Sequence, residues 1–343
     1  MVQRFVSRAR TLTARVQPHA VVLVYHRVVS VASDPWGLAV SPEHFSQQLR
    51  VLREQATPIS MRRLSDELKR GRLTRRTVAV TFDDGYGDNL TGAMPALVEH
   101  GIPATIFIPT GIWHEPGGFW WDRLEQLVLH PGQLPEHVDL QFTDMLRTWD
   151  VGDMSCYSRE AFELARGWRA WTAPENQRQQ MYVELWRLLH ECSSDERRSI
   201  LGQLEAISSQ EPHQLLSHST LTEQQLLTMR ASGLIEFGAH TVTHPSLARL
   251  SRTEQTNEIR SSKRTLEDIL NQPVESFAYP FGRMTDYTSD TVALVRDASF
   301  TIACANVSGR TSASTDPLQL PRMHVDDWNG AEFAVRLAQW LRG

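Results

Sequence analysis

Short apolar runs rich in β-branched residues alternate along this chain with longer segments in which apolar residues recur every three or four positions. The runs predict strands at Ala20–Tyr25, Thr77–Phe82, Ala104–Pro109, Ile235–Ala239, Ser276–Tyr279, Phe300–Ala303 and Leu318–Val325. The spaced segments predict helices such as Pro42–Glu54 and Arg252–Leu270. Strands that alternate with helices are typical of parallel βα units, so the pattern predicts an α/β fold.

The helix predicted over Arg252–Leu270 carries signals at both of its ends. Ser251 and Glu254 have the spacing of a capping box, in which each side chain accepts a hydrogen bond from the other residue's backbone. Asn271 follows the last apolar position and is a residue type that ends helices. We therefore expect both boundaries of this helix to lie at these residues.

The stretch from about Trp113 to Met229 has a different character. It lacks clear strands and is rich in Gln, Glu, Arg and Leu, so we expect a helical insertion there. Packing on helix faces explains most of its tryptophans, although one or two of them could instead line a sugar cleft; they are Trp120, Trp121, Trp168, Trp171 and Trp186.

Composition excludes several classes of protein. Of the 343 residues, 41% are hydrophobic and 22% are charged, which is typical of a globular chain and not of a disordered one. The net charge of −5 gives no broad basic surface, so we expect no nucleic-acid partner. The three cysteines, Cys156, Cys192 and Cys304, form no CxxC pair, which argues against both a disulfide framework and a cysteine zinc site.

The start of the chain bears on location. Its longest apolar run, Ala20–Tyr25, is too short for a membrane span or a signal sequence, so we expect a cytoplasmic protein. Residues 1–33 contain no acid and five arginines, which are Arg4, Arg8, Arg10, Arg15 and Arg27. They form either a solvated basic lead-in or a peripheral contact with the anionic inner face of a membrane.

Two adjacent carboxylates, Asp83 and Asp84, directly follow the apolar run Thr77–Phe82. Neighbouring residues on a strand point to opposite faces, so both acids can reach one site only where the strand ends. Gly85 permits the unusual backbone that such a turn requires. The alternative is that Asp84 and then Asp88 begin the next helix as an N-cap pair.

His240 and His244 follow another predicted strand at a spacing that lets two imidazoles bind one cation. Thirteen histidines in this chain give about half of one such pair by chance, so the spacing needs support from its context. That support is the preceding strand, together with an aspartate at another strand end as a third ligand. Two imidazoles and one carboxylate leave an open position, as a catalytic zinc site needs.

Two further polar groups, Tyr279–Gly282 and Arg322 with His324, also lie at the ends of apolar runs. Parallel βα barrels build their active sites at the carboxyl ends of the strands. The four groups together therefore predict a single site.

Together, Thr81–Gly85, His240–His244, Tyr279–Gly282 and the Arg322/His324 strand resemble, in order, the motifs of the polysaccharide deacetylases of carbohydrate esterase family 4. The resemblance implies one domain over residues 1–343, with the insertion at about 113–229. Its fold would be the NodB-homology type, a distorted (β/α) barrel of about seven strands. It also implies a hydrolase that removes N-acetyl groups from amino sugars with a divalent metal, commonly zinc.

The resemblance also assigns roles to residues. Asp83 corresponds to the general base and His324 to the general acid. The metal ligands correspond to Asp84, His240 and His244, and the backbone N–H of Phe281 stands at the position that stabilises the oxyanion.

The chain departs from the family pattern in the third motif and in the last one, where the usual Leu-x-His triplet is absent because Met323 precedes His324 and Leu320 lies further back. Many members begin the third motif with an arginine that contacts the base, and Ala278 stands there instead. Arg322 could supply this cation, or it could form a structural salt bridge on the barrel rim. His26, which also follows a strand, competes with His324 for the role of acid.

We therefore expect an N-deacetylase of an amino sugar in polysaccharide or lipopolysaccharide biosynthesis, with an N-acylated amino sugar as its substrate. One alternative is a deformylase of a lipid-linked amino sugar. Another is a catalytically silent carbohydrate-binding barrel, which the presence of all four predicted base and ligand residues argues against. The sugar, its linkage and the oligomeric state are not predicted.

Overall fold

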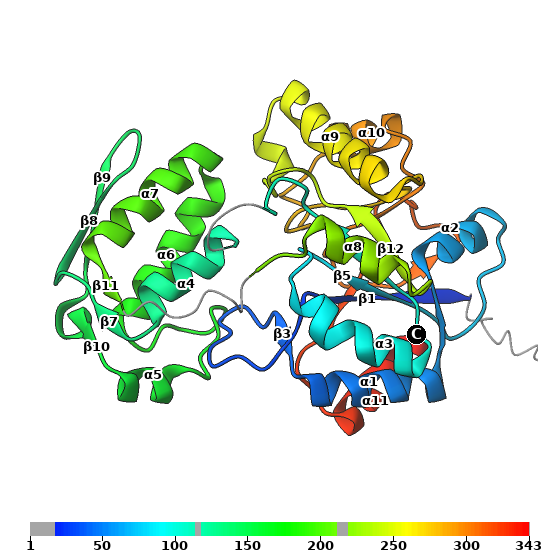
Figure 1. Ribbon diagram of the computed structural model, residues 1–343, viewed down its shortest axis with the longest axis horizontal. Coiled ribbons are helices and arrows are strands. Elements are labelled where there is room, and N and C mark those ends of the chain that lie inside the picture. Colours follow the sequence, from blue (N-terminus) through cyan, green and yellow to red (C-terminus); the bar gives the residue numbers. More distant parts are fainter. Residues whose placement is uncertain (1–17, 114–117, 211–218, 343) are drawn as a thin grey trace, which may run out of the picture.

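The structure is a computed structural model, shown in Figure 1, and it describes residues 18–113, 118–210 and 219–342. Four of the arginines of the expected basic lead-in, Arg4, Arg8, Arg10 and Arg15, lie outside these residues. The fifth, Arg27, is buried, and its Nε lies 2.9 Å from a carboxylate oxygen of Asp88. Arg27 is therefore part of the fold rather than of a membrane-facing surface.

A curled sheet of parallel strands forms the centre of the molecule. Its strands lie in the order β14, β13, β12, β6, β5 and β1. They correspond to six of the predicted runs, and their bounds are β1 (His19–Tyr25), β5 (Thr77–Phe82), β6 (Ala104–Ile108), β12 (Ile235–Ala239), β13 (Ser276–Ala278) and β14 (Ile302–Cys304).

The seventh predicted strand, Leu318–Val325, joins the two ends of this sheet. Leu320 pairs with Cys304 next to β14, and β16 (Met323–His324) lies parallel to β1. The expected continuous strand is too long, because Pro321 has no N–H for a ladder hydrogen bond and separates the two short pairings. The result is the expected α/β architecture, a distorted (β/α) barrel of the NodB-homology type.

Short strands and helices surround this sheet. β4 (Thr57–Ile59) extends it beside β5, and β15 (Thr311–Ser312) pairs antiparallel with β1. A separate small pair joins β2 (Arg27–Val28) and β3 (Ala39–Val40). The helices outside the insertion are α1 (Pro42–Gln55), α2 (Met61–Lys69), α3 (Met94–His100), α8 (Glu223–Arg230), α9 (Arg252–Leu270), α10 (Ser289–Asp297) and α11 (Gly330–Arg342).

Alternating residues of the strands fill two layers of core. On β1, Val21 and Leu23 pack in the cluster shared with the surrounding helices, whereas Ala20 and Val22 pack in a second cluster with Phe107. A strand buried on both faces has no polar alternation, which explains the continuous apolar runs. Cys304 belongs to the second cluster and is buried, but Cys156 is exposed.

The predicted ends of α9 are confirmed. Ser251 and Glu254 make both hydrogen bonds of the capping box, at 3.3 and 2.8 Å. Asn271 ends the helix in the left-handed conformation with φ of 46°. An asparagine adopts this conformation more readily than most residues, so it serves as a helix stop.

Residues 120–210 form a lobe beside the barrel, at the left of Figure 1. The lobe has its own apolar core. The sequence had indicated a helical insertion, but five short strands lie among the helices of the lobe. Its elements are α4 (Trp120–Leu129), β7 (Gly132–Gln133), β8 (His137–Gln141), β9 (Leu146–Asp150), β10 (Cys156–Tyr157), α5 (Arg159–Ala165), α6 (Gln177–Glu191), α7 (Ser194–Ile207) and β11 (Ser209–Gln210).

The end of the lobe also differs from the expected boundary near residue 229. Leu226 and Met229 of α8 are buried in the core of the barrel rather than in that of the lobe. No described helix has the length and apolar character needed to cross a bilayer.

Candidate active site

The side chains predicted to form one site meet at the carboxyl ends of the strands. Asp83 and Asp84 follow β5, His240 and His244 follow β12, and His324 lies on β16. All five line one cavity of about 170 Å³ that opens to solvent. The barrel therefore brings together groups that lie far apart in the sequence.

Asp84, His240 and His244 form a buried cluster. Oδ1 of Asp84 lies 3.5 Å from Nε2 of His240 and 3.3 Å from Nε2 of His244. The three ligand atoms all lie within 4.8 Å of one another. Burial opposes ionisation of Asp84, but its hydrogen bonds with the two imidazoles outweigh this effect and hold the pKa of this carboxyl below its ordinary value.

The backbone at Asp84 turns sharply to bring both aspartates to the site. Asp84 has φ of 72°, and the N–H of Gly85 donates to the carbonyl of Asp83 at 2.9 Å, which makes a three-residue turn. Gly85 also has a positive φ of 63°, and a Cβ there would lie 2.5 Å from Cδ1 of Ile108. The turn therefore favours glycine at position 85, next to the two aspartates that the chemistry uses. Asp88 makes no capping hydrogen bond, so an N-cap pair does not account for these acids.

The loop that carries the two histidines is held by Glu258 of α9. Its Oε2 accepts from the N–H groups of Val242 at 2.7 Å and Thr243 at 2.9 Å. Its Oε1 accepts from the Thr243 hydroxyl at 2.8 Å. These bonds fix a loop in which His244 has φ of 55°, a conformation that costs a non-glycine residue about 1–3 kcal/mol. Sequence reasoning missed Glu258, because nothing in its helical context distinguishes it from other acids of α9.

The donor set fits a divalent metal. Nδ1 of His240 lies 2.8 Å from the carbonyl of Ala278, which can only accept, so Nδ1 carries a proton. Nε2 faces the Asp84 carboxylate, so either a proton or a metal ion must lie between these two atoms. Two imidazole nitrogens and one carboxylate oxygen suit zinc and leave a position open.

Asp83 is paired with Arg322. The guanidinium donates from Nη1 to Oδ1 at 2.7 Å and from Nη2 to Oδ2 at 2.6 Å, and its Nε donates to the carbonyl of Ala305. Both side chains are buried. Burial raises the pKa of Asp83, but the charge and the hydrogen bonds of Arg322 lower it by more. The net effect is a pKa below the ordinary value, which keeps this carboxyl ionised. Arg322 thus supplies a cation beside Asp83, although position 278 holds an alanine.

The two candidate acids, His26 and His324, lie side by side with their ring centroids 5.7 Å apart. Nδ1 of His324 lies 3.2 Å from Oδ1 of Asp326, and the His324 side chain is partly exposed. His26 is buried, and its Nδ1 has no partner among the described residues. Burial lowers the pKa of His26 to about 4, so this imidazole is neutral near pH 7.

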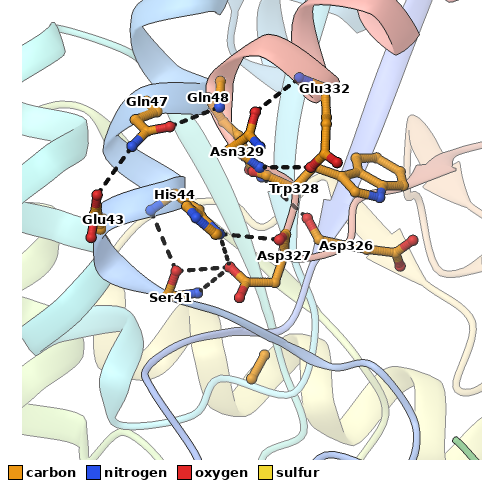
Figure 2. A network of polar contacts seen from close by, with 12 residues as sticks. Ser41, Glu43, His44, Gln47, Gln48, Asp326, Asp327, Trp328, Asn329 and Glu332 are labelled. Atoms are coloured by element: carbon orange, nitrogen blue, oxygen red, sulfur yellow. Dashed lines mark hydrogen bonds and ion pairs between the residues drawn. The ribbon is translucent and has the colours of Figure 1, made fainter. Parts of the chain in front are cut away.

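The strand that bears His324 is anchored to α1 by polar contacts, shown in Figure 2. Gln48 donates to the carbonyls of Asp326 at 3.1 Å and Trp328 at 2.8 Å. Asp327 accepts from the backbone and the hydroxyl of Ser41, the residue that caps α1. The segment that follows His324 is therefore held on the helix that covers β1.

Phe281 stands in a second sharp turn at the rim. Its φ is 57°, and the N–H of Gly282 donates to the carbonyl of Pro280 at 2.6 Å. Its ring lies between the imidazoles of His190 and His244, with centroid distances of 4.4 and 4.7 Å. Within the described part of the chain, its N–H has no hydrogen-bond acceptor. It is thus available to a ligand in the cavity.

The lobe contributes an aromatic wall to the cavity. Trp186 packs at a tilt against Trp36, with a centroid distance of 4.4 Å, and Trp121 packs edge-on against His244 at 5.0 Å. Two of the five tryptophans of the predicted insertion, Trp121 and Trp186, therefore line the cavity. Trp168 packs in the lobe core instead, as expected for a helix-packing residue.

His190 of α6 links the lobe to the rim of the barrel. Its Nε2 lies 3.3 Å from Oδ1 of Asp286, a carboxylate that is buried. Asp286 also accepts from the Ser246 hydroxyl and from the N–H of Arg283. Sequence reasoning missed this pair, since nothing local to α6 shows that one face of it reaches the barrel.

The comparisons with known proteins agree with this fold. The profile of the family described as polysaccharide deacetylase matches residues 70–163 and 203–303, more than half of the chain. The chain therefore belongs to the polysaccharide deacetylase family, whose members are hydrolases that act on carbon–nitrogen bonds other than peptide bonds.

The individual relatives share less than 30% of their residues with this chain over the matched parts. The YxkH protein of Bacillus subtilis (strain 168) is 27% identical over 116 residues, which span 34% of this chain and 40% of that protein. The Streptococcus pyogenes deacetylase PplD, solved with acetate, has a TM-score of 0.59 at 19% identity over 95% of this chain and 100% of its own. IcaB from Ammonifex degensii has a TM-score of 0.57 at 18% identity, over 95% of this chain and 98% of its own. The two solved structures share the fold of this chain.

Proposed function

We propose that this chain is a metal-dependent N-deacetylase that removes an acetyl group from an amino sugar in polysaccharide or lipopolysaccharide biosynthesis. The observation that carries the proposal is the convergence of Asp84, His240 and His244 beside an ionised Asp83. Membership of the family implies an acetylated carbohydrate substrate. The metal, with zinc as our choice, is part of the proposal.

The reaction demands help at both ends of the amide bond. A metal bound by the three ligands supplies a Lewis acid for the acyl carbonyl and for the attacking water. Asp83 accepts the proton of that water, and Arg322 keeps the carboxylate ionised and oriented toward it. The N–H of Phe281 donates to the acyl oxygen as negative charge develops there.

Departure of the amine requires a proton, which we assign to His324. Its Nδ1 contacts Asp326, so its Nε2 is the atom free to deliver a proton into the cavity. The contact with Asp326 orients the ring. The low pKa of His26 argues against that imidazole as the acid, because it carries no second proton near neutral pH.

The aromatic wall and the basic start of the chain support a proposal for the kind of sugar substrate. The side chains of Trp36, Trp121 and Trp186 line the cavity with aromatic surface against which a sugar ring can pack. We propose a lipid-linked or nucleotide-linked amino sugar at the inner face of the membrane, with the protein in the cytoplasm. The arginines near the start of the chain support a peripheral membrane contact.

The test is a screen of metal-loaded protein for release of acetate and formate from lipid-linked, nucleotide-linked and oligomeric amino sugars. We expect acetate from at least one class, and an Asp83→Asn control that binds metal but loses about 10²–10⁴ in turnover. Formate release alone would replace the proposal with a deformylase. Bound metal without any acyl release would indicate a silent carbohydrate-binding barrel.

A further inference from the structure

A second cavity of about 120 Å³ adjoins the active site on the side of the lobe. It shares two lining residues, Trp121 and His244, with the active-site cavity. Its far wall comes from α4 and α7 and includes Arg123, Arg197 and Arg198. A group bound against this wall would therefore lie next to a substrate held at His244.

Arg197 is unusual among the arginines of this wall. Its side chain is buried with 6% of the residue exposed, and its Nε donates to the carbonyl of Leu189 at 2.7 Å. Its guanidinium lies over the ring of Trp120, 5.4 Å from the centroid. No carboxylate among the described residues pairs with it, whereas Arg123 pairs with Glu205 and Arg198 with Asp195.

A buried guanidinium without a carboxylate is a costly arrangement, since burial disfavours the charge. Arg197 lines the cavity, and neither of its Nη atoms is a fully buried atom without a partner in the described part of the chain. Both Nη atoms are therefore accessible from the cavity. A second unpaired donor lies in the same wall, because the indole N–H of Trp120 is buried without a partner among the described residues. The accessible guanidinium indicates a ligand that accepts hydrogen bonds and carries negative charge, whereas the indole N–H of Trp120 is fully buried behind it.

The geometry points to a subsite in this second cavity for an oxyanion group of the substrate, held by the guanidinium of Arg197. The shared chemistry is that of a phosphate or a uronate carboxylate, either of which accepts charge-assisted hydrogen bonds from a guanidinium. The inference rests on the proposed function for the identity of the sugar at His244. It adds that the natural substrate is anionic close to the sugar that is deacetylated.

The test measures binding without turnover, by calorimetry on the full-length, metal-loaded Asp83→Asn protein. The probes are N-acetylglucosamine 1-phosphate, a glucuronate-containing N-acetylglucosamine disaccharide and neutral chitobiose. We expect Arg197→Gln to weaken binding of at least one charged probe by about 10- to 100-fold and to leave chitobiose unchanged. The probe that responds identifies the source of the charge. Arg147→Gln, an exposed arginine of β9 in the same lobe, is the matched control and should have no effect.

A second variant protects the test against misfolding of Arg197→Gln. Ser194 is exposed, lines the same cavity and lies in the first turn of α7, where an acidic residue is favourable for the helix. Ser194→Glu should weaken the charged probe by about tenfold or more and spare chitobiose. Equal losses for all probes, or no loss for either charged probe, would overturn the subsite. Failure of the acyl-release screen would bear on the proposed function and not on this result.

Discussion

Arg322 donates two parallel hydrogen bonds to Asp83, although the two residues lie 239 positions apart in the chain. The contact is possible because the segment around β16 closes the sheet beside β1, which is paired with β5. The arginine that many family members carry in the third motif is thus replaced by one on the closing strand. At the vacated position the carbonyl of Ala278 accepts from His240. Arg322 thus places a cation beside Asp83, the base of the proposed mechanism.

The Arg322 contact predicts a shift in pH dependence. Arg322→Lys keeps a positive charge but loses the two-bond geometry, so the pKa of Asp83 should rise toward its ordinary value. In the proposed mechanism ionised Asp83 is the base, so the acid limb of the pH–rate profile should move to higher pH. The metal content should stay unchanged. A variant with the wild-type profile would show that Arg322 does not hold Asp83 for catalysis.

The role of His324 predicts a difference between substrates. His324→Ala should lower turnover strongly on amides and much less on esters with phenol leaving groups, because those leave with little proton donation. His26→Ala should lack this selectivity, and rates on matched amide and ester substrates give the comparison. Equal losses on both substrates would make His324 a structural residue. A selective amide defect in His26→Ala would move the role to that imidazole.

The support of the histidine loop by Glu258 predicts a loss of metal affinity without removal of a ligand. Glu258→Ala leaves the N–H groups of Val242 and Thr243 without their acceptor. We expect metal affinity to fall about 10- to 100-fold, as for other residues that orient metal ligands. Titration against a competing chelator measures this, and Asp268→Ala, an exposed acid of α9, is the control. Unchanged affinity would show that the loop holds its conformation without Glu258.

The network of Figure 2 predicts that replacement of Gln48 lowers both the stability of the fold and the turnover. Gln48 is fully buried, and it also accepts from the hydroxyl of Tyr25 at 3.0 Å. Gln48→Leu leaves buried polar groups unpaired, at about 1–3 kcal/mol for each. We expect a lower free energy of unfolding in urea, together with lower turnover because the segment after His324 is released. Gln47→Leu, a partly exposed neighbour on α1, should have a smaller effect on both. Full turnover in a destabilised Gln48→Leu protein would show that this network does not affect catalysis.

The barrel and its rim could be predicted from the sequence because their signals are local. An apolar run followed directly by polar residues identifies both a buried strand and its carboxyl end, as at Asp83 and His240. Tertiary contacts could not be predicted in this way. Trp186 and His190 reach the cavity only through the packing of α6 over the barrel rim. The strand β8 was missed although Val138 and Leu140 alternate with polar residues, because the stretch around it is dominated by helical patterns.

Asp84, His240 and His244 should together bind a divalent metal. Elemental analysis of the purified wild-type protein, beside Asp84→Ala and His240→Ala, tests this without knowledge of the substrate. We expect about one equivalent of metal, with zinc as the first choice, in the wild-type protein and a large loss in both variants. Wild-type protein that binds no divalent metal, or variants that retain the full equivalent, would contradict this expectation.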